Sequence, residues 1–344
     1  MEMNVEHYNE DGSAWNAFVV SHSDSTNYHL YGWREVIKKS FGHKTYYLTA
    51  RNNNNDICGL LPLAYIKSAL FGKSLVSLPF FNYGGILCSC DEAEAALLEA
   101  SARMRKELNA AYTEFRHLLR SDRVAATKKH KVTMILNLNK VEEQQWKELD
   151  PKVRNQVRKA EKNGLKAVVG QLDLLDGFYE VFSRNMRDLG TPVYSKKFFQ
   201  NMLETFPESS CIISVMLDGT TVASGILTWF RDTLEVPWAS SNSDYRDKCP
   251  NNLLYWEAIK FAIGKGLTRF DFGRSTPGEG TFRFKKQWGA QPVQLYWQYL
   301  LEEGREMPAL NPDNPKYKLA IKLWQRLPVP LTKLLGPSIV RNIP

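Results

Sequence analysis

The sequence lacks the motifs of several common enzyme classes. It has no Gly-x-x-x-x-Gly-Lys-Ser/Thr loop, no Gly-x-Ser-x-Gly segment and no His-Glu-x-x-His pair, which argues against P-loop chemistry, Ser-His-Asp catalysis and zinc-dependent hydrolysis. All six histidines precede residue 131. Any catalysis by the second half of the chain would therefore use side chains other than imidazole.

Cysteine and long apolar runs are also scarce. The five cysteines are an odd number at unrelated spacings, and the one close pair, Cys88 and Cys90, has no second pair or His nearby. A disulfide framework and a structural metal site are therefore not expected. The longest uncharged run, residues 74–90, contains Pro79 and two glycines and is too short to span a bilayer. The polar, acidic first residues do not resemble a signal peptide, which predicts a cytoplasmic location.

Positive charge is concentrated at the C-terminal end. Lys and Arg number 45 against 37 Asp and Glu, a net charge of +8, and residues 316–344 hold six of these cations and no acid. The rest of the chain is nearly balanced, which argues against a nucleic-acid-binding module. The tail mixes these cations with leucines, so it either packs on the body with solvated lysines or contacts anionic lipid at the inner face of a membrane. Three prolines predict short helical pieces rather than one long amphipathic helix.

Two stretches of the chain repeat the same order of elements. Alternating or continuous apolar runs, polar turns and helical spacing predict strand, strand, strand, helix, strand in each stretch. The first covers residues 44–50, 57–66, 74–80, 91–109 and 112–118, with a further strand at 131–138. The second covers residues 211–217, 221–230, 233–240, 251–265 and 269–273. Between them, residues 141–163, 174–187 and 195–206 have helical patterns. The repeat predicts two similarly folded α/β domains, residues 1–150 and 151–304, followed by the tail 305–344.

A basic stripe is predicted on the helix that begins at Pro151. Arg154, Arg158 and Lys162 recur every four residues before Gly164, which is typical of a helix end. Such a stripe is either a solvated face or a site for phosphates of a nucleic acid or an activated carrier.

The segment after the last predicted strand combines charge with glycine. Asp271 is followed by a polar, glycine-rich loop that contains Arg274, and then by Lys285 and Lys286 among aromatic residues. Loops at strand ends commonly carry functional groups. The alternation over residues 282–286 fits an ordinary edge strand equally well.

Two further segments are weaker candidates. Tyr83 precedes Gly84 and Gly85, which allow either a close backbone approach to a ligand or a tight turn. Arg187 and Tyr194 lie in a polar stretch between two predicted helices.

Three segments of the sequence together resemble one known family, namely RNQVRKAEKNGL, MRDLGTPVYSKKFF, and DFGRST followed by RFKKQWGA. They are similar to the FemAB-like branch of the GNAT-type acyltransferases, and within it to the FemAB-related proteins found with exosortase and extracellular polysaccharide systems. The resemblance covers about residues 25–300. It implies an α+β fold of two tandem GNAT-like domains with mixed, mostly antiparallel sheets. The implied activity is transfer of an aminoacyl group from a charged tRNA to an amine on a cell-wall precursor.

The resemblance also assigns residues. Lys285 matches the lysine of a Phe-Lys-x-x-aromatic-Gly motif that handles the acyl donor and the transition state. Lys38 corresponds approximately to a lysine that holds precursor phosphates, and Arg187 and Tyr194 loosely to an Arg and a Tyr of the same pocket.

Aminolysis of an activated ester or thioester requires a deprotonated amine and a stabilised oxyanion. We expect Lys285 to supply the positive charge and Asp271 to accept or orient a proton, with Asp271 as a purely structural ion-pair partner as the alternative. Phosphates are expected on Lys38, Arg154, Arg158 and Arg274, and further substrate contacts at Tyr83 and Lys286. No metal or resident cofactor is expected. The donor is aminoacyl-tRNA or acyl-CoA, and a non-catalytic membrane-peripheral adaptor is the remaining alternative.

Overall fold

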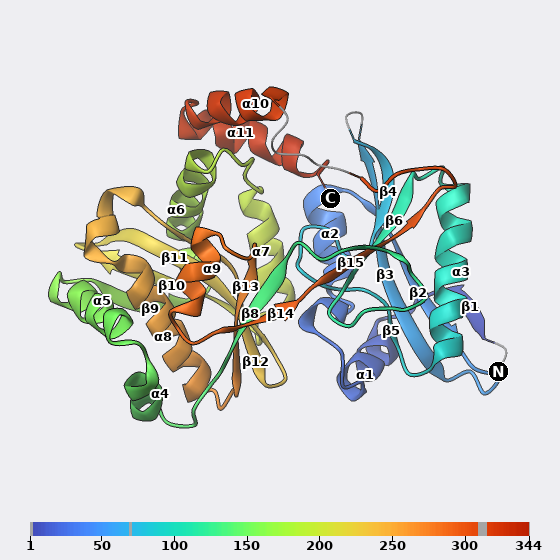
Figure 1. Cartoon of the computed structure of the whole chain (residues 1–344), viewed down its shortest axis with the longest axis horizontal. Coiled ribbons are helices and arrows are strands. Elements are labelled where there is room, and N and C mark those ends of the chain that lie inside the picture. The colour runs from blue at the N-terminus through green and yellow to red at the C-terminus, as the bar shows by residue number, and fades with distance from the viewer. Residues whose placement is uncertain (1–2, 69–70, 309–314, 344) are drawn as a thin grey trace. The chain divides into compact units, whose positions relative to one another are not determined.

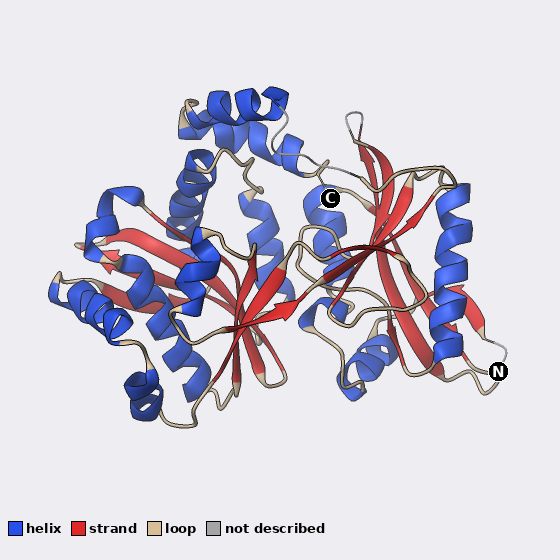
Figure 2. Cartoon of the chain, in the orientation of Figure 1, coloured by secondary structure: helices blue, strands red, loops and turns tan. Residues whose placement is uncertain are grey.

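The computed structural model describes residues 3–68, 71–308 and 315–343. The chain forms two compact units (Figures 1 and 2). The first contains residues 1–130, 294–310 and 341–344, and the second contains residues 131–293 and 311–340. The units divide at residues 130 and 293 instead of the predicted 150 and 304, because the strand at residues 132–137 pairs in the sheet of the second unit and the strand at residues 296–301 pairs in the sheet of the first.

The first unit is built around a mixed sheet. Its strands are β1 (Asn4–His7), β2 (Lys44–Arg51), β3 (Ile57–Ser68), β4 (Gly72–Val76), β5 (Leu87–Cys88), β6 (Tyr112–His117), β7 (Ala126–Lys128) and β15 (Tyr296–Leu301). The order is β1-β2-β3-β4-β6-β15-β7, with β5 beside β3. Only β4 and β6 are recorded as a parallel pair among the described strands of this sheet. Helices α1 (Ser13–Ser21), α2 (Trp33–Phe41) and α3 (Asp91–Glu107) accompany it.

The second unit repeats this plan. Its strands are β8 (Val132–Asn137), β9 (Lys166–Gly170), β10 (Ser210–Leu217), β11 (Thr220–Phe230), β12 (Thr233–Ser241), β13 (Arg269–Ser275) and β14 (Gln291–Gln294). The order is β14-β8-β13-β12-β11-β10-β9, and β12 and β13 run parallel. The predicted order of three strands, a helix and a strand is confirmed in both units, as β2-β3-β4-α3-β6, with the two-residue strand β5 added before α3, and as β10-β11-β12-α8-β13, where α8 is Pro250–Gly264.

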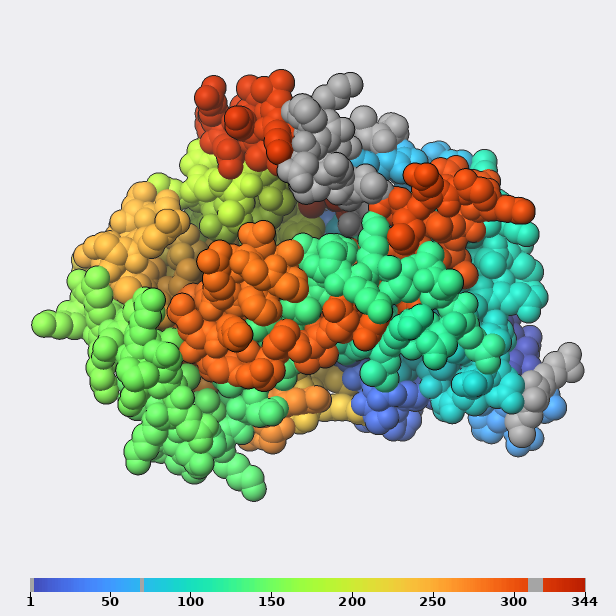
Figure 3. Space-filling view, in the orientation of Figure 1, coloured from blue at the N-terminus to red at the C-terminus, as the bar shows by residue number. Residues whose placement is uncertain are grey.

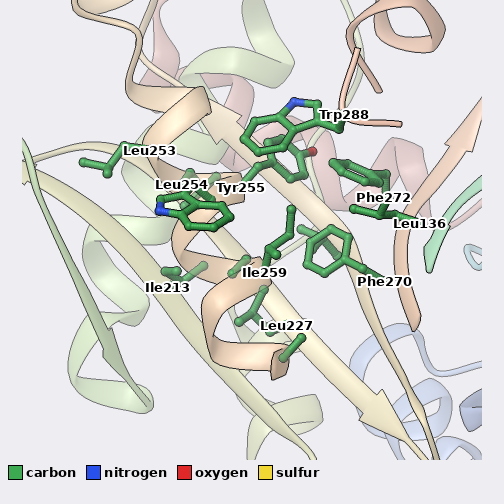
Figure 4. Packing of buried hydrophobic residues seen from close by; sticks show 14 of the residues in the cluster. Leu136, Ile213, Leu227, Leu253, Leu254, Tyr255, Ile259, Phe270, Phe272 and Trp288 are labelled. Carbon is green, nitrogen blue, oxygen red and sulfur yellow. The ribbon is translucent and has the colours of Figure 1, made fainter. Parts of the chain in front are cut away.

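The main core of the second unit lies between its sheet and α8. Leu254 and Ile259 of α8 pack on Ile213, Leu227 and aromatic residues of β13 (Figure 4). Because successive strand residues face opposite sides, the remaining strand residues point to the other face. There α6 (Leu175–Asp188) contacts β10, β11 and β12, and α7 (Lys196–Thr205) follows it.

Three local predictions need correction. Residues 141–163 form two helices, α4 (Glu142–Glu148) and α5 (Pro151–Lys162), because the Asp150 carboxylate caps a new helix that starts at Pro151. Residues 282–286 belong to a helix, α9 (Gly280–Lys286), instead of an edge strand. The tail forms two short helices as predicted, α10 (Pro315–Gln325) and α11 (Val329–Val340), but Pro337 lies inside α11 and does not break it.

Candidate functional site

The candidate site begins where β12 and β13 stop pairing. The two strands are in register over three residue pairs, and the last pair is Glu235 with Asp271. Beyond this pair β12 continues to Ser241 and β13 to Ser275 without further register between them. Residues in register project to the same face of a sheet. The Glu235 and Asp271 side chains therefore stand side by side, on the face opposite to the α8 core.

Asp271 is held in a dry position. Asp271 is only 3% exposed to solvent. Its Oδ1 accepts hydrogen bonds from Thr133 Oγ1 at 2.5 Å and from the Gly273 N–H at 2.7 Å. Burial raises the pKa of Asp271 to about 7, while the Gly273 N–H and the charge on Lys285 act in the opposite direction. A carboxyl group with this pKa can exchange a proton near neutral pH.

Lys285 reaches the same end of β13 from α9. Aromatic contacts hold this helix in place, with Phe284 packed on Tyr255 at a ring distance of 5.4 Å. Lys285 is 7% exposed, and its Nζ donates to the carbonyl oxygens of Gly273 at 2.9 Å and Arg274 at 3.0 Å. Burial lowers the pKa of Lys285 to about 8, and the charge on Asp271 opposes this shift. Lys285 therefore remains mainly an ammonium group at neutral pH.

The structure adds Glu235, Thr133 and Lys131 to this site. Glu235 is buried, and its charge acts on Lys285. The Lys131 Nζ donates to Thr276 Oγ1 at 2.6 Å, and burial together with Arg274 lowers its pKa. None of these three residues was predicted from the sequence. The sequence signal for Glu235 was an acidic residue within a predicted strand that is otherwise mostly apolar. In the structure this residue is buried.

The basic stripe on α5 forms as predicted, with Pro151 at its start and Gly164 in the left-handed conformation at φ 79° after its end. Arg154 is half-buried and Arg158 is exposed. The Arg158 guanidinium lies 5.4 Å from the Trp146 ring of α4. The stripe thus belongs to the layer formed by α4, α5 and α8, whereas Lys285 and Asp271 are held by α9 and β13.

Arg187 and Tyr194 have structural contacts. Arg187 donates from Nε to Asp188 Oδ1 at 2.6 Å and from Nη1 to the Leu327 carbonyl at 3.1 Å, which ties the end of α6 to the tail. The Tyr194 carbonyl accepts a hydrogen bond from the Tyr179 hydroxyl at 2.9 Å. Lys286 is exposed on α9.

Arg274 is exposed near the end of β13, and the last two predicted residues lie in the first unit. Lys38 is exposed on α2 and pairs with Glu35 at 2.9 Å. Tyr83 is buried and lines a pocket of about 160 Å³ together with His29, Arg116 and His117.

Gly85 and two buried histidines shape this pocket. A Cβ at Gly85 would lie 1.8 Å from His117 Cδ2, so glycine is needed there. Burial lowers the pKa of His29 and of His117 to about 4, so both rings are neutral at physiological pH. Among the described residues, no group of three or more His, Cys, Asp or Glu side chains could hold a metal ion.

Comparison with known proteins identifies the domain that contains the site. Residues 151–286 match the model of the acetyltransferase (GNAT) domain. A segment of 117 residues is 27% identical to lipid II:glycine glycyltransferase from Staphylococcus epidermidis. This segment covers 32% of the chain and only 26% of that relative.

Solved structures show the same fold over most of the chain. The crystal structure of FemX matches with a TM-score of 0.66 at 17% identity, and the match covers 93% of this chain and 100% of the FemX chain. A tandem GNAT protein from the clavulanic acid biosynthesis pathway matches with a TM-score of 0.57 at 8% identity, over 89% of this chain and 100% of that chain. The predicted architecture of two GNAT-like domains with mixed sheets is thereby confirmed.

Proposed function

We propose that this chain, which carries a GNAT domain over residues 151–286, is an N-acyltransferase of the FemAB type. It would transfer an aminoacyl or acyl group to an amine of a cell-wall or exopolysaccharide precursor. The observation that carries the proposal is the buried pair of Asp271 and Lys285 at the point where β12 and β13 separate. The similarity to a lipid II:glycine glycyltransferase supports the class of acceptor.

The pair supplies the two functions that aminolysis needs. The acceptor nitrogen attacks the carbonyl carbon of the donor, a C–N bond forms and the amine proton passes to the Asp271 carboxylate. Two N–H groups of the Lys285 ammonium donate to carbonyl oxygens within the described chain, and the third can donate to the developing oxyanion. Collapse of this intermediate breaks the bond to the leaving oxygen or sulfur, which takes up the proton.

An aminoacyl-tRNA is the donor that we favour over acyl-CoA. Helix N-termini bind pyrophosphate through free backbone N–H groups. At the start of α8, Pro250 has no N–H, and the Asn252 N–H donates to the Cys249 carbonyl at 3.1 Å. This helix start is therefore poorly suited to a CoA pyrophosphate. Arg154, Arg158, Arg274 and Lys38 are proposed phosphate contacts, with Lys286, Arg187, Tyr194 and Tyr83 as further substrate contacts.

An acceptor carried on a lipid would require the enzyme to work at a membrane surface. We therefore include a peripheral position at the cytoplasmic face in the proposal. Among the described residues, no helix is both long enough and apolar enough to cross a bilayer.

The proposal is tested with purified protein and a matrix of donors and acceptors. The donors are charged tRNA, acetyl-CoA and longer acyl-CoAs, and the acceptors are lipid-linked and nucleotide-linked cell-wall precursors. Mass spectrometry should detect a new amide on one precursor with charged tRNA. Transfer from acyl-CoA alone would replace the proposed donor, and no product in any combination would contradict the proposed function.

A further inference from the structure

The two C-terminal helices of the second unit present leucines to solvent. Leu334 of α11 is 72% exposed, and Leu319 and Leu323 of α10 are 58% and 54% exposed. In Figure 3 the described part of this tail forms the red outer surface beside the yellow-green atoms of the segment that contains α6. Three large apolar side chains exposed on two consecutive helices point to an interaction surface, because exposed apolar patches mark sites that bind proteins or membranes.

One side of α11 is packed against the body of the second unit, and large apolar side chains are exposed elsewhere on the helix. Thr332, Gly336 and Val340 are buried at a spacing of four residues. A Cβ at Gly336 would lie 2.8 Å from the backbone nitrogen of Val193, so this side of the helix is in close contact with the body. Leu331 and Leu334 lie on the opposite side and are exposed, and Leu335 and Ile339 are exposed along the flank of the helix.

Helix α10 is arranged in the same way and adds charge. Ile321 packs against Gly190, and Gln325 Nε2 donates to the Asp188 carbonyl at 2.9 Å, which fixes the inner side of the helix. Leu319 and Leu323 project outward. The exposed cations Lys318, Lys322 and Arg326 form a row along one side of these leucines, and no Asp or Glu occurs between Asn314 and the C-terminal residue.

We propose that α10 and α11 form a docking surface for an anionic lipid bilayer. Leucines flanked by long cationic side chains fit the boundary between acyl chains and phosphate headgroups, where the leucines are buried and the cations remain at the phosphates. The absence of acid from this segment gives complementarity to an anionic surface. This inference specifies how the peripheral position in the proposed function is achieved.

The test is co-sedimentation of the full chain with vesicles of phosphatidylglycerol and phosphatidylcholine in equal parts, compared with pure phosphatidylcholine. The wild-type protein should bind the anionic vesicles and dissociate as salt is raised. Replacing Leu319, Leu323 and Leu334 with Ser should weaken binding at least tenfold. The variant Lys318→Ser/Lys322→Ser/Arg326→Ser should weaken it about a hundredfold, at roughly 1 kcal/mol per cation.

A matched variant removes three exposed cations from other helices, Lys39→Ser/Lys106→Ser/Lys147→Ser. It should bind like the wild type. Any of three results would overturn the proposed docking surface. These are no binding of the wild-type protein to anionic vesicles, an equal loss of vesicle binding in both charge variants, or undiminished vesicle binding by the leucine variant. Conversion of a dimer to a monomer by the leucine substitutions without an effect on vesicles would overturn it as well. The assay contains no donor or acceptor, so its failure is separate from failure of the acyl transfer.

Discussion

At the scale of single residues, one buried environment shifts the pKa values of two ionisable groups toward neutral pH. Burial raises the pKa of Asp271 to about 7 and lowers that of Lys285 to about 8. Groups whose proton affinities are brought close to the working pH can act as base and acid in one cycle. Their mutual attraction limits both shifts, so the two groups titrate as a coupled pair.

Substituting Asp271 with Asn tests the proposed base. The Asn Oδ1 can accept the same hydrogen bonds from Thr133 and Gly273, so the fold should be retained. The rate of acyl transfer should fall about 10² to 10⁴-fold, the usual contribution of a general base. The rise of wild-type kcat/KM through about pH 7 should disappear in the variant. A variant with the wild-type rate and pH profile would exclude Asp271 as the base.

The same carboxyl group makes stability depend on pH. Its pKa is raised from 3.8 to about 7 on folding, so the folded state binds the proton more tightly. The stabilisation is complete below about pH 4 and is lost as the pH rises toward 7. We expect the difference in unfolding free energy between wild type and Asp271→Asn to change over this interval in chemical denaturation. An unchanged difference from pH 4 to 7 would show that Asp271 is not desolvated.

At the scale of elements, the first unit contains a parallel strand pair that corresponds to β12 and β13, but its acidic residue is held in an ion pair. β4 and β6 pair in parallel over three residue pairs that end at Val76 and Glu114, just as β12 and β13 end at Glu235 and Asp271. Glu114 Oε1 accepts a hydrogen bond from Arg116 Nε at 2.7 Å, and Arg116 Nη1 donates to the Phe81 carbonyl at 2.7 Å. The Glu114 carboxylate is thus already occupied by a buried ion pair with Arg116.

The variant Glu114→Gln should therefore affect stability and spare catalysis. It leaves the Arg116 charge buried without its partner, which costs about 3–5 kcal/mol. The transfer rate per folded molecule should stay near the wild-type value, in contrast to Asp271→Asn. Denaturant unfolding and steady-state kinetics on the same samples distinguish the two effects. A large loss of rate in stably folded Glu114→Gln would contradict the assignment.

The close contact of α11 with the body depends on one glycine. The variant Gly336→Ala should displace this helix, because the added Cβ meets the Val193 backbone, and overpacking typically costs about 1–3 kcal/mol. Limited proteolysis should release the tail faster than in the wild type. Gly264→Ala in α8 is the control, since a Cβ there meets nothing within 4 Å. Equal proteolysis of both variants would contradict the packing.

The spacing of apolar residues in the sequence predicted most helices and strands, but it failed where one segment fits both a strand and a helix. The alternation in β10 to β12 and the helical spacing of α3 and α8 gave their positions directly. Residues 282–286 alternate aromatic and basic side chains, so a strand was as consistent as a helix. The structure forms α9 there because Phe282, Phe284 and Trp288 all join the core beside α8. Lys285 was predicted from its motif, whereas Glu235 required knowledge of which strand lies beside β13.

At the scale of the whole molecule, the chain returns to its first unit after completing most of the second. β15 inserts between β6 and β7, far from both in sequence. Gln298 of β15 is fully buried, donates to the Ser121 and Val124 carbonyls and accepts from the Ser121 N–H and the His117 ring. Pairings this distant leave no local signal, which is why the boundaries at residues 130 and 293 could not be predicted.

Two truncations test this connection. Ending the chain after Val293 removes β15 and should expose the amides of β6 to hydrogen exchange. Ending it after Gly304 retains β15 and removes α10 and α11, so β6 should stay protected. Hydrogen exchange of β6 measured by mass spectrometry separates the outcomes. Equal protection in both truncated proteins would show that β15 is dispensable for the first unit.

The most direct test of the central claim is transfer of a labelled aminoacyl group from charged tRNA to a lipid-linked precursor by the wild type and by Lys285→Met. Loss of a preorganised donor to the oxyanion costs about 10²–10³ in kcat. We predict amide formation by the wild type and a loss of this size in the variant, with folding confirmed by circular dichroism. A folded Lys285→Met protein that transfers at the wild-type rate would contradict the account.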